Sequence, residues 1–188
     1  MEQGSQEWFE ARLGHVTASC IADVMAQIKT GEAAARANYR AQLVAERLTR
    51  QPQESYSNAA MQWGIDNEPF ARSAYEIANG VMVDQVGFVK HPTIEFAGAS
   101  PDGLISDDGM IEIKCPNTQT HIDYCVTGNI PRKYVLQMQW QMECTGRKWC
   151  DFVSYDPRMP AHMQLFVKRM SRDQQLIESI KTEVIALS

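Results

Sequence analysis

The spacing of apolar residues predicts helices over the first part of the chain. Hydrophobic side chains recur there every three or four residues, which is the period of an amphipathic helix. Thr17 is a good N-cap for the second of these runs, and Gly14 and Gly80 follow the first and the last. We expect helices over residues 5–13, from 18 towards 26, over 32–50 and over 58–78, the last kinked or restarted at Pro69.

Alternation of apolar and polar residues predicts strands further on. We expect them over residues 81–90, 94–97, 103–106, 110–114, 149–155 and 163–168. Helices are expected over 118–126 and 131–144, and a closing helix starts at Ser171, where Gln174 completes a capping box. This order of elements predicts an α+β fold with a central mixed β-sheet flanked by helices, in a single domain that spans residues 1–188.

The segment from Ser100 to Pro116, SPDGLISDDGMIEIKCP, carries the candidate chemistry. Ile111 and Ile113 alternate with Glu112 and Lys114, so the two pairs point to opposite faces of a strand. Turn residues separate this strand from the apolar run before it. The segment therefore predicts a β-hairpin.

Loop length decides where Asp102 lies in this hairpin. A two-residue turn would put Asp102 on the apolar face. A three-residue loop that ends at a left-handed Gly109 pairs Ile105 with Ile111 and places Asp102 opposite Lys114. We predict the second register, because only this one gathers the polar groups on one face.

Two carboxylates and an amine at a strand end suit metal-dependent cleavage of a phosphodiester. Asp102 and Glu112, with the backbone carbonyl of Ile113, are oxygen ligands of the kind that Mg²⁺ prefers, with Mn²⁺ as a substitute. Lys114 would orient or deprotonate the attacking water; a metal lowers the pKa of this amine, whereas carboxylates raise it. An ordinary turn followed by a charge pair on an exposed strand face would give the same sequence pattern.

Composition and charge narrow the class of protein. The chain has 188 residues, 44% of them hydrophobic, so it can bury a core without disulfides or a structural metal. Five cysteines without a C-x-x-C pair indicate reduced thiols, and no apolar segment has the length of a membrane span. We expect a cytoplasmic protein without membrane contact.

The distribution of charge favours an enzyme over a protein that coats nucleic acid. The net charge is -5, and residues 51–113 hold ten acids against two bases. The flanking residues 11–50 and 114–188 carry a small excess of Lys and Arg. An acidic centre that binds cations, between segments that contact phosphates, fits an enzyme that grips DNA, although solvated faces give the same pattern.

Five segments carry a resemblance to a known family. They are WFEARLGHVTAS from Trp8, WGIDNEPFAR from Trp63, the hairpin with EIKCP, YVLQMQ from Tyr134 and YDPRM from Tyr155. In this order they resemble lambda exonuclease and its phage recombination relatives, the YqaJ-like group of the PD-(D/E)XK nucleases. The resemblance implies a restriction-endonuclease-like core.

The resemblance also implies an activity and partners. It implies a Mg²⁺-dependent double-strand DNA exonuclease that digests the 5′ strand processively to mononucleotides and leaves a 3′ single strand. It further implies a homotrimer ring that encloses the DNA, and a single-strand DNA annealing protein that receives the product strand.

Two residues near the N-terminus correspond to the family's pocket for the 5′-phosphate. These are Arg12, in RLG, and Ser19, in TAS. Their chemistry agrees with the role, because a guanidinium grips phosphate oxygens in pairs and amides at a helix start bind anions.

The resemblance implies roles for four further residues. Glu68 corresponds to a helical glutamate of the metal cluster, although Pro69 beside it departs from the family pattern. Ser100 and Gln137 correspond to polar residues that line the scissile phosphate and order water. Gln137 is counted among the catalytic residues with Asp102, Glu112 and Lys114. Met61 sits where the family has an apolar wedge that splits the terminal base pair.

Two other functions fit the same core. A restriction-like or repair endonuclease would share it, but no recognition module is visible in 188 residues. A non-catalytic module that binds DNA ends would not need Asp102, Glu112 and Lys114 together. We therefore expect the exonuclease.

Overall fold

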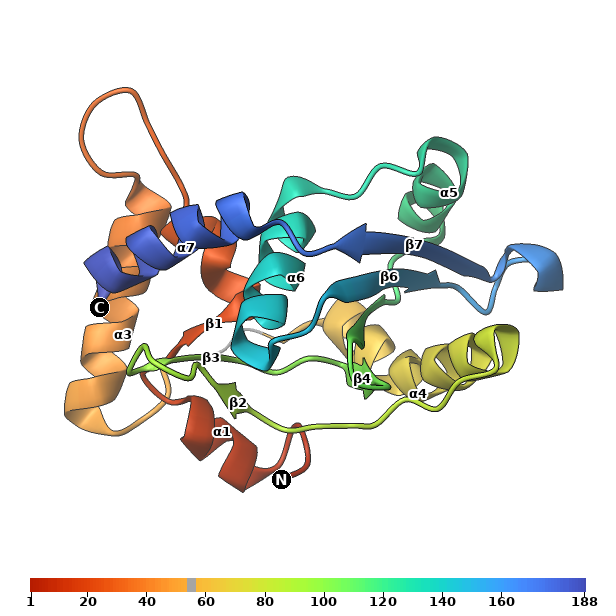
Figure 1. The fold of residues 1–188 in the computed structure, drawn as a ribbon, viewed down its shortest axis with the longest axis horizontal. Helices are drawn as coiled ribbons and strands as arrows, with labels where there is room; N and C mark the ends of the chain where they lie inside the picture. Colours follow the sequence, from red (N-terminus) through yellow and green to blue (C-terminus); the bar gives the residue numbers. More distant parts are fainter. Residues whose placement is uncertain (54–56) are drawn as a thin grey trace.

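The computed structural model describes residues 1–53 and 57–188, which form two mixed sheets and the helices that cover them (Figure 1). The smaller sheet has the order β1-β3-β2, with β1 parallel and β2 antiparallel to β3. The larger sheet has the order β4-β5-β6-β7, and only β5 and β6 are parallel. The strands are β1 (Val16–Thr17), β2 (Val89–Lys90), β3 (Ala97–Ala99), β4 (Gly103–Ile105), β5 (Gly109–Lys114), β6 (Trp149–Tyr155) and β7 (Leu165–Ser171).

The structure confirms the predicted class of mixed sheet flanked by helices, but the strands form two sheets instead of one central sheet. The helices are α1 (Gln6–Arg12), α2 (Ile21–Val24), α3 (Ala34–Thr49), α4 (Ala59–Asn79), α5 (Thr118–Thr127), α6 (Arg132–Thr145) and α7 (Gln174–Leu187), with 3₁₀ turns η1 (Ala18–Cys20) and η2 (Ala161–Met163). None of the helices in the described part of the chain is long and apolar enough to cross a membrane.

Helix α6 lies between the two sheets and contributes to two cores. Its Met138 and Met142 pack with Phe152 on one face of the larger sheet. Its Trp140 packs with the small sheet and with α2, α3 and α7. Helix α4 covers the opposite face of the larger sheet through Tyr75. Glu112 and Lys114 leave β5 on the α6 side, because Ile111 and Ile113 fill the α4 side.

The predicted hairpin forms, but its predicted register is wrong by two residues. Ile105 pairs with Gly109, and Gly103 pairs with Ile111. The left-handed loop residue is Ser106, with φ of 49°. Gly109 lies in the strand, where the ring of Trp149 occupies the space of a side chain: a Cβ on Gly109 would lie 2.1 Å from Trp149 Cζ2. A shift of two residues leaves every side chain on its predicted face.

Several element boundaries also differ from the predictions. The run 81–90 pairs only at Val89–Lys90 and at an isolated bridge of Asp84 with Leu104, and the expected strand 94–97 begins at Ala97. Thr17 makes no side-chain cap, and α2 ends at Val24 rather than near Ala26.

The closing helix α7 and helix α4, which contains Pro69, also differ from the predictions. The closing helix starts at Gln174 with Asp173 as its N-cap, because Ser171 still pairs with Trp149 in β7. Helix α4 continues through Pro69 without restarting.

Candidate active site

Glu112, Lys114 and Gln137 meet between β5 and α6. Lys114 Nζ lies 2.9 Å from Glu112 Oε1 and donates to Gln137 Oε1 at 3.3 Å. The same ammonium lies 4.3 Å from the centre of the Tyr134 ring, one helical turn before Gln137. Helix α6 therefore fixes the direction of the lysine from two positions on one face.

Asp102 joins this group from the position directly before β4. Its Oδ2 accepts from the amide of Ile113 at 2.7 Å. That amide lies beyond the last paired residues of the hairpin, so the side chain takes the place of a further strand residue. Burial raises the pKa of Asp102 well above its usual value, and the neighbouring carboxylates of Glu112 and Glu68 raise it further.

Glu68 approaches from α4, on the other side of the sheet. Its Oε1 accepts from Arg72 at 2.9 Å, one turn along the helix. Burial raises the pKa of Glu68, and this effect together with the negative charge of Glu112 outweighs the lowering by Arg72. Three carboxylates from three elements thus act on one another electrostatically.

The protonation of Lys114 follows from the same charges. Burial alone would lower the pKa of this amine, but Glu112 and Asp102 outweigh burial, and the net shift is upward. Lys114 is therefore an ammonium at neutral pH in this arrangement.

The donor set fits an oxygen-preferring divalent cation. Asp102, Glu112 and Glu68 supply carboxylate oxygens, and their mutual repulsion is the kind of excess charge that a dication offsets. Each carboxylate already has a partner within the protein, and no three metal-binding side chains form a ready-made cluster in residues 1–53 and 57–188. Binding a cation would therefore exchange contacts such as that between Lys114 and Glu112.

A cleft of about 700 Å³ opens beside these groups, between α4, the end of β5 and the starts of α5 and α6. Met61, Glu68 and Lys114 all line it. Met61 is 49% exposed, so its side chain is available to a substrate rather than buried in a core.

The predicted 5′-phosphate residue Arg12 is linked to this site through Trp8. The Arg12 guanidinium lies 3.9 Å from the centre of the Trp8 ring, and Trp8 Nε1 donates to Ser100 Oγ at 3.0 Å. Ser100 stands two residues before Asp102. Arg12 Nε is buried without a hydrogen-bond partner among the described residues, and burial lowers the pKa of the guanidinium. An unpaired N–H donor on a partly buried guanidinium suits an anionic ligand.

Ser19 is exposed in η1, and its hydroxyl lies 3.4 Å from Thr17 Oγ1. No hydrogen bond joins it to Arg12 in the described part of the chain. Cys20, next to Ser19, is among the groups that act electrostatically on Arg12. The two predicted phosphate residues therefore lie in one neighbourhood without direct contact.

Sequence reasoning gave no role to three residues that touch the site, Trp8, Tyr134 and Gln141. Trp8 contacts the site through Ser100, and the signal that could have identified it is its indole N–H, which usually finds an acceptor when it is buried. Gln141 donates to Glu112 Oε2 at 2.9 Å, and its position one turn after Gln137 is the signal that could have identified it.

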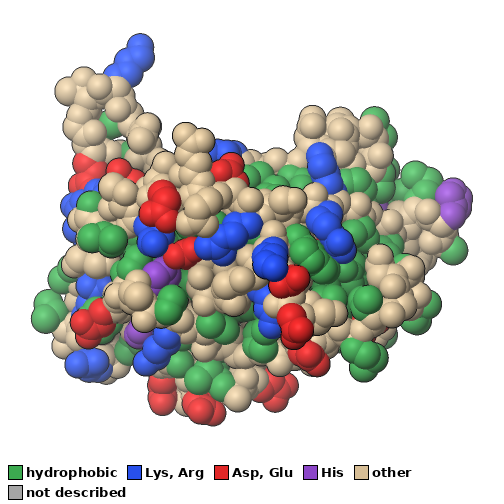
Figure 2. All heavy atoms as spheres, in the orientation of Figure 1, with side chains coloured by type: hydrophobic (Ala, Val, Ile, Leu, Met, Phe, Trp, Pro, Cys, Tyr) green, Lys and Arg blue, Asp and Glu red, His purple; other side chains and the backbone are tan. Residues whose placement is uncertain are grey.

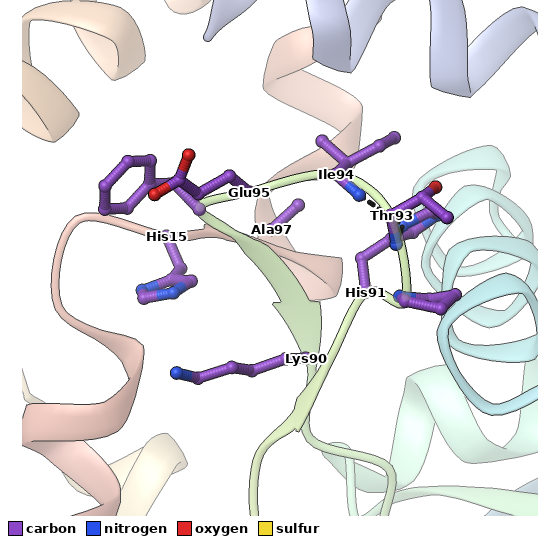
Figure 3. Close-up of a pocket in the computed structure, with 9 residues that line it drawn as sticks. His15, Lys90, His91, Thr93, Ile94, Glu95 and Ala97 are labelled. Carbon is purple, nitrogen blue, oxygen red and sulfur yellow. Dashed lines mark hydrogen bonds between the residues drawn. The ribbon is translucent and has the colours of Figure 1, made fainter.

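A second pocket, of about 370 Å³, lies apart from the carboxylates at the edge of the small sheet (Figure 3). His15 and Lys90 project into its opening, while His91 lies against α6. None of Glu68, Asp102, Glu112 and Lys114 lines this pocket, so the larger cleft is the candidate active site.

The outer charges are largely paired with one another. Arg36 and Arg40 of α3 both bond Glu32, and Arg36 also reaches Glu183. Figure 2 shows Lys and Arg interleaved with Asp and Glu on the side of the molecule that faces the viewer. The positive charge of α3 is thus mostly neutralised.

Known proteins resemble this chain in sequence and in fold. The family model of the YqaJ-like viral recombinase domain matches residues 7–148, whereas no curated protein matched the chain. The alkaline exonuclease LHK-Exo from Laribacter hongkongensis is 55% identical, with a TM-score of 0.91 over 97% of this chain and 90% of that one. A structure of LHK-Exo in complex with dAMP gives the same values.

A more distant structure supports the fold. The phage related exonuclease from Haemophilus somnus 129PT is 16% identical, with a TM-score of 0.71 over 92% of this chain and 91% of that one. The sequence identity to LHK-Exo is high enough to show the class of enzyme as well as the fold. The chain is therefore a deoxyribonuclease of the phage exonuclease type. The chain belongs to the YqaJ-like viral recombinase family.

Proposed function

We propose that this chain is a Mg²⁺-dependent exonuclease that digests the 5′ strand of duplex DNA ends processively and leaves a 3′ single strand. The observation that carries the proposal is the short path from Arg12 through Trp8 to Ser100 and Asp102. It links a guanidinium whose buried Nε has no partner among the described residues to the segment that carries Asp102. A terminal phosphate held by Arg12 and Ser19 would place the next phosphodiester beside Asp102, Glu112 and Lys114.

Hydrolysis at this position regenerates the group that the pocket binds. A water oxygen bonds to phosphorus and the bond from phosphorus to the 3′-oxygen breaks, so the nucleotide leaves with a 3′-hydroxyl and the strand keeps a new 5′-phosphate. Each cut therefore makes the next end for Arg12. The complex of LHK-Exo with dAMP supports a mononucleotide product.

The side chains divide the chemistry between them. A Mg²⁺ ion held by Asp102, Glu112, Glu68 and the carbonyl of Ile113 would polarise the phosphate and acidify the attacking water. Lys114, charged through its carboxylate neighbours, donates to the water or to a phosphate oxygen.

Polar groups beside the cleft would complete the arrangement. Gln137 holds the lysine and orders the water, and Ser100 would line the scissile phosphate. Met61, which is exposed at the cleft, would enter between the terminal bases, where an apolar side chain offsets part of the unstacking energy.

The wider assembly is part of the same proposal. The family resemblance supports a homotrimer ring that encloses the duplex and a single-strand DNA annealing protein that receives the 3′ strand. We also propose a cytoplasmic location and one nuclease domain over residues 1–188. The core that joins Val16 and Trp140 to Val184 supports the single domain.

A digest of linear duplex DNA tests this function. The DNA carries 5′-phosphates and a label at each 3′ end, and it is incubated with Mg²⁺ or with EDTA. With Mg²⁺ we expect mononucleotides and labelled single strands from the linear DNA, and with EDTA we expect no products. Covalently closed circular duplexes, incubated with Mg²⁺ in parallel, should remain uncut. Cut circles would instead indicate an endonuclease.

A further inference from the structure

We propose that Gln141 is a positioning residue that holds Glu112 in the orientation needed to bind the divalent cation. The inference rests on the proposed metal dependence. Neither the sequence motifs nor the family match assigns a role to this residue.

The contacts of Glu112 assign different tasks to its two oxygens. Oε1 faces Lys114 Nζ at 2.9 Å, while Oε2 accepts from Gln141 Nε2 at 2.9 Å. Glu112 and Gln141 are only 2% and 1% exposed, so water does not compete for this bond. Gln141 therefore anchors the oxygen that Lys114 does not use and fixes the rotation of the carboxylate. Groups that orient a ligand in this way commonly contribute 10- to 100-fold to metal affinity.

The other half of the Gln141 side chain argues against a purely structural role. Its Oε1 is buried and has no hydrogen-bond partner among the described residues. An unpaired buried carbonyl opposes folding, so an apolar side chain would fill this place at lower cost. The amide is explained by its bond to Glu112.

Gln139, two residues earlier on α6, provides a matched comparison. It is 2% exposed and of the same type. Its Nε2 donates to Ser171 O at 3.0 Å, and its Oε1 accepts from Asp173 N at 2.8 Å. Both amide atoms thus fasten the segment before α7, and neither touches the site.

The test compares Gln141→Met with Gln139→Met in the full chain. Methionine has nearly the same length and lacks the amide. Mn²⁺ is titrated into each protein by calorimetry without DNA, and thermal unfolding is measured in parallel. We expect Gln141→Met to weaken Mn²⁺ binding at least tenfold. We expect Gln139→Met to lower the unfolding temperature more while Mn²⁺ affinity stays within about threefold of the parent value.

The outcomes separate this inference from the proposed function. If the parent protein binds Mn²⁺ and Gln141→Met binds it equally well, the positioning role is wrong and the proposed function stands. If the parent protein does not bind Mn²⁺, the metal dependence fails and the inference fails with it. Should Gln141→Met not fold, Gln141→Leu serves as a second apolar variant under the same criteria.

Discussion

At the scale of single residues, alternation along the strand was enough to predict one face for Glu112 and Lys114. Period two depends only on local backbone geometry, so it survives an error in register. The partners that orient these groups come from α6, at least 20 residues later in the chain. Tyr134 therefore could not be linked to the site before the helix was placed against the sheet, and Gln141 could be linked only through its spacing from Gln137.

Lys114 carries the most direct prediction at this scale. We expect Lys114→Met to lower the maximal rate of nucleotide release about 10²- to 10⁴-fold, because the ammonium beside the phosphate and water is lost. Initial rates at saturating DNA measure the effect. Lys148→Met is the control, since Lys148 is exposed and pairs with Asp108 away from the cleft. A Lys114→Met rate within threefold of the parent would refute the role.

Protonation of His91 should make the free energy of unfolding depend on pH. Its Nδ1 accepts from the amides of Thr93 and Ile94, so a proton there would break both bonds. Burial lowers the pKa of His91, and Glu143 opposes this only in part. The unfolded chain therefore takes up the proton first, and stability is lost as pH falls from about 6.5 towards the lower folded pKa.

Thermal unfolding at several pH values checks this prediction. We expect the unfolding temperature to fall between about pH 7.5 and 5.5. His91→Asn, which keeps an acceptor near Nδ1 but does not titrate, should show a flatter dependence. Identical slopes for both proteins would show that His91 does not cause the loss.

At the scale of elements, sequence patterns located the helices with clear ends and missed the boundaries set by tertiary packing. Helix α4 begins after Asn58 and ends before Gly80, as its caps indicate. The hairpin register was misjudged because Gly109 looked like a turn residue. Its real requirement is the ring of Trp149, from a strand forty residues later, which no local pattern reveals.

The observed register predicts opposite effects for two small substitutions. Ser106 is left-handed, so Ser106→Gly should raise the free energy of unfolding by up to about 1 kcal/mol. Gly109→Ala should lower it by about 1–3 kcal/mol, because the new methyl group meets Trp149. Urea unfolding measures both. In the predicted register Ser106 would be a strand residue, so a destabilising Ser106→Gly would favour that register.

At the scale of the whole molecule, helix α6 connects the fold to the chemistry. One of its sides packs on the larger sheet, another on the small sheet, and its polar side holds Lys114 and Glu112. Helix α1 brings Arg12 to the same region through Trp8. Composition and periodicity predicted the fold class and the pair Asp102 and Glu112, but the link from Arg12 through Trp8 to Ser100 depends on how helix α1 packs on the rest of the fold.

The central claim is that the 5′-phosphate bound by Arg12 sets the position of the cut. The most direct measurement compares the digestion rates of linear duplexes that carry 5′-phosphate or 5′-hydroxyl ends, with the parent protein and with Arg12→Ala, in Mg²⁺. We predict that the parent digests phosphorylated ends at least tenfold faster and that Arg12→Ala loses this preference, since a charge-assisted phosphate contact contributes about 1.5–3 kcal/mol. Equal rates on both ends with the parent protein would contradict the account.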